Sequence, residues 1–592
     1  MRIWKSIFAL CLLLGLWPGR AAAGGLELLP GGTRSVARGG AVAARPEDPM
    51  TQLHNPAGLT KLPGVQFLFS LELPLHDMCV DPYGYYGWGV YEAGTTEFGD
   101  QLALENPNDP QPGLDNDYAS SPLPKVCNSA RSLPIPQIGL SIELTDQLSI
   151  GIGHLFPTVV PGMQFGGPDG TIETELAGTT VARPTPTRYQ LIKQEVVAGF
   201  APSFAVAYQA VPTLSFGLNL QLAIVKAKTW VVQNAVAGTQ PSTDMLAELE
   251  AEDLFVPSLT FSVFAEPTPA IDLMASFRWV DNFDGSGSVK FETNTYPETG
   301  ADGGVPETAH ENKALDLSQV KVGLPWALTL GFRYSGLLSG GVVSGVSDSR
   351  RAPDPMDSEL WDVELDLGYS FNARAGKNTV QAGEDVVLYT RDAKGDGGRI
   401  EVDLDDLSQF DIDRHLKDSV TLRLGGSYSI VPRQVALHAG TFYESRGVEP
   451  EYVNIDTFAL ARVGVGIGVL WRLGMVDLTA SYGHIFQEQF ELAPPAHEPL
   501  PLPEGEFDED NPPPPDRGFD QRVGGTFGAD GVRQGGVVLE DPDAPAPGEG
   551  DATAALQQEA AVSTVSRPNR VINAGKYTAS FDVIAIGVNL RF

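Results

Sequence analysis

The sequence has few cations, few cysteines and no long apolar run beyond its first residues. Its 592 residues include 40 Lys and Arg against 75 Asp and Glu, which gives a formal net charge of −35. This balance argues against nucleic acid as a partner, because phosphate binding requires a basic surface. After residue 23 no apolar run reaches about 18 residues, so no membrane-spanning helix is expected there.

The first 23 residues have the pattern of a secretory signal peptide. Arg2 and Lys5 form a basic start, residues 6–17 are largely apolar, and Ala21–Ala23 provide a small-residue cleavage site. We therefore expect an exported protein whose mature chain begins at Gly24.

Two of the three cysteines, Cys79 and Cys127, lie beyond this leader. An even number of cysteines in an exported chain predicts a disulfide, here within the first long loop. The alternative is a pair of free thiols.

Apolar residues alternate with polar residues or glycine along most of the chain. In residues 214–224 and 361–369, every second position is Leu, Phe, Ile, Val, Trp or Tyr. Such a period of two is typical of strands with one apolar face. We expect fourteen strands, near 64–75, 135–144, 148–157, 194–210, 214–227, 255–266, 271–291, 326–336, 360–371, 419–431, 435–446, 456–473, 476–490 and 576–592.

The connections between these strands alternate in length. Long ones include 76–134, 292–325 and the Pro-rich, acidic 491–575, whereas five others are very short. A soluble sandwich also has alternating strands but does not require this arrangement of loops. An even strand count, short turns on one side and long loops on the other are typical of a transmembrane β-barrel of the Gram-negative outer membrane. Only 337–359 departs from this rule, because it is a long connection on the side of the short turns.

The last strand supports this interpretation. Ile584, Ile586, Val588, Leu590 and Phe592 share one face, and the chain ends on the aromatic residue. This pattern resembles the signal that the barrel assembly machinery of the outer membrane reads. The expected surroundings are outer-membrane lipid and lipopolysaccharide, and the expected state is a monomer.

The segment 34–63, RSVARGGAVAARPEDPMTQLHNPAGLTKLP, resembles the start of the FadL family of outer-membrane long-chain fatty-acid and aromatic-hydrocarbon transporters. The matching features are Gly39-Gly40, Asp48 and the motif Asn55-Pro56-Ala57. Further similarity follows in the family's order at 140–157, 201–224, 324–334, 417–430 and 573–592.

The resemblance implies that residues 24–62 form a hatch inside a barrel of residues 63–592. It also implies passive uptake of a hydrophobic small molecule, with hatch movement and sideways exit into the bilayer at a kink in the third strand. Neither a cofactor nor a metal ion is expected.

The third strand contains a change of phase at the expected kink. Leu148, Ile150 and Ile152 point to one face, which would place His154 toward lipid and Leu155 toward the lumen. A bulge at Gly153-His154 would restore the pattern, because one extra residue reverses the facing. The alternative is that the strand ends there. Gly151 and Gly153 carry no side chain, so we expect Asn55-Pro56-Ala57 to pack against Gly151–His154.

Two further groups of residues are candidates for substrate contact. Gly464, Gly466 and Gly468 would face the lumen and leave space for the hatch or for a ligand. Met245, Leu246 and Leu249, in the expected loop 229–253, fit a short amphipathic helix. In the family, outward loops form an apolar groove, and this helix could line it; packing within the loop is the alternative.

Charged residues occur at positions that should face the lumen. An arginine there could bind a substrate carboxylate, but such charges more often pair with one another across the wall. These residues are Arg278, Arg333, Arg423, Arg462, Asp362, Glu364, Asp366 and Glu444.

No H-E-x-x-H, G-x-S-x-G or P-loop motif is present, so no catalytic residues are assigned. Two other functions stay open at this point. One is a lipid-degrading enzyme of the outer membrane, and the other is a structural or adhesive barrel whose long loops bind partners.

Overall fold

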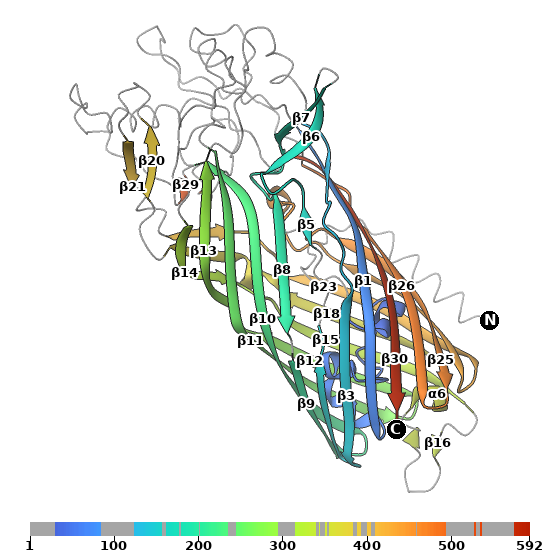
Figure 1. The fold of residues 1–592 in the computed structure, drawn as a ribbon. Coiled ribbons are helices and arrows are strands. Elements are labelled where there is room, and N and C mark those ends of the chain that lie inside the picture. The colour runs from blue at the N-terminus through green and yellow to red at the C-terminus, as the bar shows by residue number, and fades with distance from the viewer. Residues whose placement is uncertain are drawn as a thin grey trace, which may run out of the picture.

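The computed structural model is a closed antiparallel barrel of fourteen strand positions, in agreement with the sequence (Figure 1). The last strand pairs with the first over its whole length, from Gln66 with Arg591 to Pro82 with Gly575. This pairing leaves no free edge at the closure. The structure describes residues 30–83, 123–156, 162–176, 179–200, 202–234, 244–293, 314–338, 342–343, 350–351, 354–382, 387–391, 399–403, 409–456, 459–492, 526–527, 533–534 and 574–592.

Several of the fourteen positions consist of two consecutive segments. In order around the barrel they are β1 (Val65–Pro82), β3 (Ile135–Thr145), β4 (Leu148–His154) with β5 (Met163–Gln164), β8 (Lys193–Phe200) with β9 (Pro202–Val211), β10 (Leu214–Asn234), β11 (Asp244–Thr268), β12 (Ile271–Val280) with β13 (Phe283–Thr293), β14 (Ala314–Val322) with β15 (Trp326–Leu337), β18 (Glu359–Phe371) with β19 (Lys377–Ala382), β22 (Gln409–Asp413) with β23 (Ser419–Val431), β24 (Val435–Glu444), β25 (Arg462–Leu473), β26 (Val476–Gln487) with β27 (Phe490–Leu492), and β30 (Gly575–Arg591).

The remaining described elements are short. They are β2 (Val126–Cys127) beside β1, the hairpins β6 (Thr171–Leu176) with β7 (Thr179–Pro184), β16 (Val342–Val343) with β17 (Arg350–Arg351), β20 (Val387–Arg391) with β21 (Arg399–Asp403) and β28 (Thr526–Phe527) with β29 (Arg533–Gln534), the helix α6 (Pro355–Ser358), and the 3-10 turns η3 (Asn372–Ala375) and η5 (Pro450–Tyr452). The leader and most of 491–575 lie outside the described residues.

The outer face of the barrel is an apolar belt. Along β15, Leu328, Leu330 and Phe332 point outward and are about 40% exposed, whereas Arg333 is buried in the lumen. Exposed aromatic residues gather near the short turns, namely Tyr208, Tyr334, Trp361, Tyr428 and Trp471. A second aromatic group lies toward the other end and consists of Phe277, Trp326, Tyr369 and Phe371. Such a belt between two aromatic girdles fits a lipid environment.

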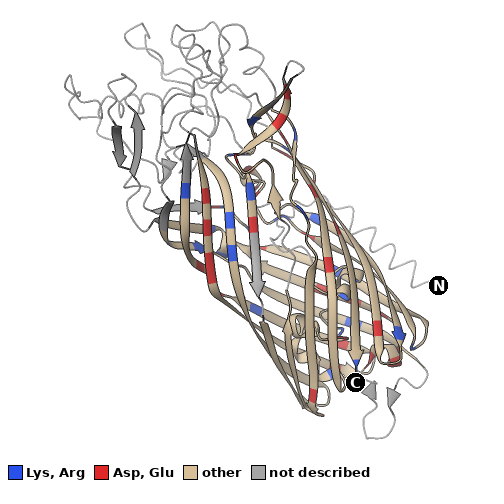
Figure 2. Cartoon of the chain, viewed as in Figure 1, with Lys and Arg blue, Asp and Glu red and all other residues tan. Residues whose placement is uncertain are grey.

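Lys, Arg, Asp and Glu are frequent on the upper parts of β8, β10, β11 and β13 (Figure 2). No helix of the described residues is long and apolar enough to cross a bilayer.

Residues 30–62, which we call the lumenal segment, lie inside the lower half of the barrel (Figure 1). They contain α2 (Thr33–Ala37), α3 (Thr51–His54) and η1 (Pro56–Lys61), and nearly all of their side chains are buried. Their contacts are with inward-facing residues of the wall, such as Asp366 and Ser262.

The interior at the long-loop end is filled by an apolar cluster. The connection between β24 and β25 contributes five residues that are at most 2% exposed, which we call the outer closure: Val448, Val453, Ile455, Ala459 and Leu460. They pack against inward-facing Phe442, Tyr577 and Phe581 of the wall. In this structure, therefore, an apolar core closes the lumen at that end.

The predicted short helix around Met245, Leu246 and Leu249 is wrong. β10 continues to Asn234 and β11 begins at Asp244, so all three residues lie in a strand. The sequence there also alternates, and Lys228 of β10 lies opposite Glu250 and forms an ion pair with Glu248 of β11. Cross-strand pairing of opposite charges therefore prevails over a helical spacing of only five residues.

Candidate functional site

The lumenal segment is held to β18 by buried ion pairs. The Arg38 guanidinium lies 2.9 Å from Asp362 and 2.7 Å from Glu364, and none of the three side chains is exposed. Arg45 lies 3.0 Å from Glu359 and 2.7 Å from Asp362. A buried charge pair is costly to break, because one partner is left unpaired away from water.

Backbone hydrogen bonds reinforce the same contact. The amides of Val42 and Ala43 donate to the Asp366 carboxylate at 3.0 and 3.1 Å, and that of Ala44 donates to Glu364 at 2.5 Å. The acidic inner face of β18 is therefore a binding surface for residues 38–45. We call residues 38–45 and this face the anchor.

Several of the predicted lumenal charges belong to the anchor or pair across the wall. Arg333 lies 2.8 Å from Glu359 and also pairs with Asp272. Arg462 lies 2.6 Å from Glu444. These arrangements match the alternative in which lumenal charges bind one another.

The three predicted lumenal glycines of β25 face α2 or a wall aromatic. A side chain at Gly466 would overlap the Val36 carbonyl, and one at Gly468 would lie 2.6 Å from the Ala37 methyl group. A side chain at Gly464 would meet the Phe442 ring. In this conformation, the space that two of these glycines leave is occupied by the lumenal segment.

The Asn55-Pro56-Ala57 motif starts η1. The Asn55 side chain accepts from the Gly58 amide at 3.2 Å and donates to the Ala43 carbonyl at 2.9 Å. The Ala57 amide donates to Ser262 of β11 at 2.8 Å, and Ala57 also lies against Gly217 of β10.

The prediction that this motif contacts Gly151–His154 is therefore wrong. Gly151 is approached instead by residues that flank the motif: a side chain at Gly151 would lie 2.9 Å from Gln52 and 3.1 Å from Leu59. The 3-10 turn directs the motif toward β10 and β11, and leaves its neighbours to face the third strand.

The third strand is interrupted after His154. Up to that residue β4 pairs regularly with β3 and with β9, so the predicted bulge at Gly153-His154 is absent and the strand ends instead. Pairing with β8 resumes only at Met163–Gln164 of β5. In the described ladders, therefore, residues 135–137 of β3 and 195–200 of β8 have no strand-pairing partner on the side that faces the third strand.

After His154 the chain turns into the lumen. Leu155 is fully buried and packs with Met50, Leu53 and Leu68. The Gln221 side chain of β10 donates to the Leu155 carbonyl. The ring of Phe156 meets that of His154 edge to face, with 4.9 Å between centroids. The phase change read from the sequence is thus real, and Leu155 faces inward as expected.

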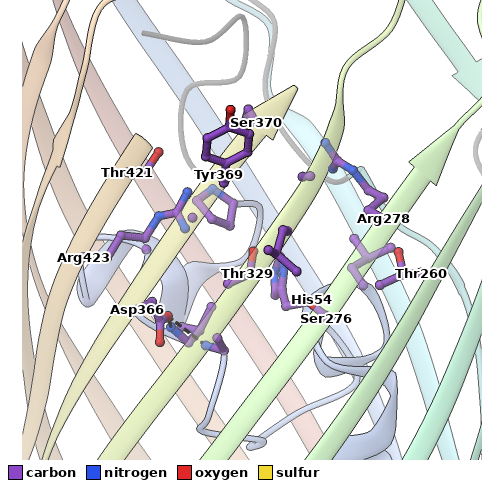
Figure 3. A pocket seen from close by; sticks show the side chains of 18 of the residues that line it. His54, Thr260, Ser276, Arg278, Thr329, Asp366, Tyr369, Ser370, Thr421 and Arg423 are labelled. Atoms are coloured by element: carbon purple, nitrogen blue, oxygen red, sulfur yellow. Dashed lines mark hydrogen bonds between the residues drawn. The ribbon is translucent and has the colours of Figure 1, made fainter. Parts of the chain in front are cut away.

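A cavity of about 100 Å³ remains between the lumenal segment and the wall. His54 and Asp366 line it, and Arg278 and Arg423 lie on opposite sides of it (Figure 3). Sites for drug-sized ligands typically measure about 300–1,000 Å³, so this cavity is too small for a long-chain fatty acid.

The remaining predicted site residues lie outside this region. Cys79 of β1 and Cys127 of β2 face each other at the long-loop end and form a disulfide with 4.0 Å between their Cα atoms. Leu246 packs with Trp230 and Ile192, and Leu249 packs with the cluster of Ala247 and Ala251. These two leucines belong to different clusters and do not form one groove.

Several site residues were not predicted, among them Arg38, Arg45, Glu72, Gln137 and Gln221. The last three are polar side chains at inward positions of otherwise apolar strands, which was the available signal. Their partners lie far away in the sequence, so no local pattern identifies them.

No protein-family model matches this chain, and no curated protein is found to be related. Among solved structures, a FadL homologue of Pseudomonas aeruginosa aligns with 96% of this chain and all of its own, with 10% identity and a TM-score of 0.57. The toluene transporters TodX of Pseudomonas putida and TbuX of Ralstonia pickettii also align with 96% of this chain and 99% of theirs, at 12% identity and TM-scores of 0.49 and 0.47. The first of these matches shows that the chain has the FadL fold.

Proposed function

We propose that this protein is an outer-membrane channel for passive uptake of hydrophobic small molecules, either long-chain fatty acids or hydrocarbons. The observation that carries the proposal is the interruption of the third strand beside a filled lumen. Backbone groups in lipid must be paired, so an interruption at this depth suggests a functional role.

The filled lumen argues against a water-filled pore. The lumenal segment occupies the lower half, and the outer closure occupies the end with the long loops. A polar solute would need a continuous aqueous path. An apolar solute could instead leave sideways through the interruption and dissolve in the bilayer.

The small cavity implies that substrate entry requires movement. We propose that residues 24–62 act as a hatch, of which 30–62 are described, and that part of this hatch shifts when substrate binds. The fold shared with a FadL homologue supports a hydrophobic substrate, because the family that the sequence resembles transports long-chain fatty acids and aromatic hydrocarbons.

The proposed location is the outer membrane, where the apolar belt contacts lipid and the long loops face lipopolysaccharide. The protein would be a monomer inserted by the barrel assembly machinery, which would recognise the strand ending at Phe592. Transport would need no cofactor and no catalytic residue.

Reconstitution of the full mature chain in proteoliposomes tests the proposal. Radiolabelled oleate and toluene should enter faster than into protein-free liposomes, whereas arabinose should not enter faster. Entry of arabinose would indicate a porin, and release of fatty acid from the phospholipid would indicate an enzyme. Absence of any flux would leave an adhesive or structural barrel.

A further inference from the structure

At the strand interruption, Phe156 is held by a buried side chain of β3. Gln137 of β3 is fully buried, and its amide binds the backbone of Phe156 from both sides. The Phe156 amide donates to Gln137 Oε1 at 2.7 Å, and Gln137 Nε2 donates to the Phe156 carbonyl at 3.2 Å. Gln137 thus takes the place of the ladder bonds that β3 lacks at this point.

The same glutamine is bonded to a buried carboxylate. Gln137 Nε2 lies 3.3 Å from Glu72 Oε1, and Glu72 of β1 is 1% exposed. The amide of Gly32, in the lumenal segment, donates to the same carboxylate oxygen at 2.7 Å. Glu72 therefore joins the start of the lumenal segment to the side chain that holds the interrupted strand.

A direct contact links the same two places. A side chain at Gly31 would lie 2.5 Å from the Phe156 carbonyl oxygen and 3.1 Å from Gln137 Nε2. The Gly31 carbonyl is bonded to His54 Nε2 at 2.8 Å. Gly31 therefore cannot move toward β3 without displacing Phe156, because there is no room for even a methyl group between them.

The two ends of the lumenal segment differ in how firmly they are held. Residues 38–45 are fixed by several buried ion pairs of the anchor. Gly31 and Gly32 are instead held by hydrogen bonds to the Glu72 carboxylate, the His54 ring and the Val36 amide. Breaking a buried ion pair costs more than exchanging a hydrogen bond, so movement is easier at residues 31–32.

We propose that Glu72 and Gln137 are positioning residues that couple the start of the lumenal segment to the strand interruption. When Gly31 and Gly32 shift, Glu72 releases Gln137, and Gln137 releases Phe156, while the anchor stays in place. This inference rests on the proposed function for its role in transport, but the coupling itself is a property of the folded protein.

Amide hydrogen exchange with residue-level detection tests the coupling on the mature barrel. Gln137→Leu should speed exchange of the Gly32 amide, although Gln137 does not bind that amide. Glu72→Leu should in turn speed exchange of the Phe156 amide, because coupling between two sites is reciprocal. We expect at least about a tenfold effect at each distant amide, the scale set by the loss of a hydrogen bond to a charged group.

Gln66→Leu is the matched control, because it removes an equally buried glutamine on β1 whose described partner is Asn589 of β30. It should leave the Gly32 and Phe156 amides unchanged. Glu72→Gln keeps an oxygen acceptor and should restore most of the protection. If each leucine variant affects only the amide next to it, the coupling is refuted.

Gly31→Ala provides a second test if the leucine variants fail to fold. Its methyl group should displace Phe156 and raise exchange there, and an unchanged Phe156 amide would refute the direct contact. Gln137→Leu should also raise oleate influx in proteoliposomes severalfold over Gln66→Leu, and equal influx in the two would refute the role in transport. Absence of influx in the wild type would instead refute the proposed function, while the exchange data would still decide the coupling.

Discussion

Replacement of Arg38 by methionine should release the lumenal segment without destroying the barrel. Methionine has similar length but removes the cation that lies 2.9 Å from Asp362 and 2.7 Å from Glu364, and both carboxylates are buried. Asp362 keeps its pair with Arg45, whereas Glu364 loses its ion-pair partner. Breaking such a pair costs about 3–5 kcal/mol. The wall keeps its strand ladders, so the loss should appear as local detachment of residues 30–62.

The assay is limited proteolysis of the detergent-solubilised protein, with hydrogen exchange of residues 30–62 read in parallel. A local loss of 3–5 kcal/mol corresponds to roughly a hundredfold to several thousandfold faster exchange, if exchange follows local opening. The barrel itself should keep its heat-modifiable migration on electrophoresis. Lys226→Met is the control, because it removes an ion pair with Glu250 whose side chains are well exposed, and it should change neither readout.

Neutralising Glu364 provides the decisive comparison. Adding Glu364→Gln to Arg38→Met neutralises the carboxylate that has lost its partner and leaves the Asp362–Arg45 pair intact, so it should restore part of the protection. Our account of the anchor is refuted if Arg38→Met leaves the segment as protected as in the wild type. It is also refuted if the added Glu364→Gln makes the loss larger.

Three further predictions concern other parts of the molecule. Reduction of the Cys79–Cys127 disulfide, which spans 48 residues, should lower the free energy of unfolding by about 4 kcal/mol in the chain-entropy model, as measured by denaturant titration with and without reductant. Ile455→Asp would place a charge in the outer closure and should open that end, so arabinose-driven liposome swelling should be greater than with Ile455→Val. Gly466→Val would overlap the Val36 carbonyl and should raise exchange across α2; unchanged exchange would show that the contact is not tight.

The sequence predicts the barrel well, because each lipid-facing residue follows the period-two rule independently. Outward Leu328, Leu330 and Phe332 alternate with inward residues, as expected, and the fourteen strand positions agree with the structure. The additional segments β14, β19 and β22 were missed. In β14 the apolar Leu317 and Val320 are buried and pack with Val380, so this segment lacks the apolar outer face by which the other strands were recognised.

The strand interruption shows where sequence reasoning reaches its limit. The change of phase at His154 and Leu155 is visible in the sequence and indicates that Leu155 turns inward. A bulge and a strand end both produce that facing, so the pattern alone cannot choose between them. The choice depends on Gln137 and Gln221, which hold Phe156 and Leu155 from other strands.

The placement of the lumenal segment shows a similar limit. Asn55-Pro56-Ala57 could be recognised as a rigid turn, but its contacts with Ser262 and Gly217 depend on the direction that η1 gives the chain. Likewise, the sequence does not distinguish Arg38 from the other arginines, because its partners on the inner face of β18 come close only in the folded chain.

The central claim, sideways exit at the interrupted third strand, is tested most directly by mapping where a substrate touches the protein during uptake. Proteoliposomes would be given a photoactivatable long-chain fatty acid, illuminated during influx, and the labelled residues identified by mass spectrometry. The account predicts label at His154–Phe156, which excess unlabelled oleate should remove, and weaker label there in Arg38→Met if the segment no longer guides the substrate. Label confined to the lumenal wall, or equal label along the whole outer belt with none favoured at His154–Phe156, would contradict it.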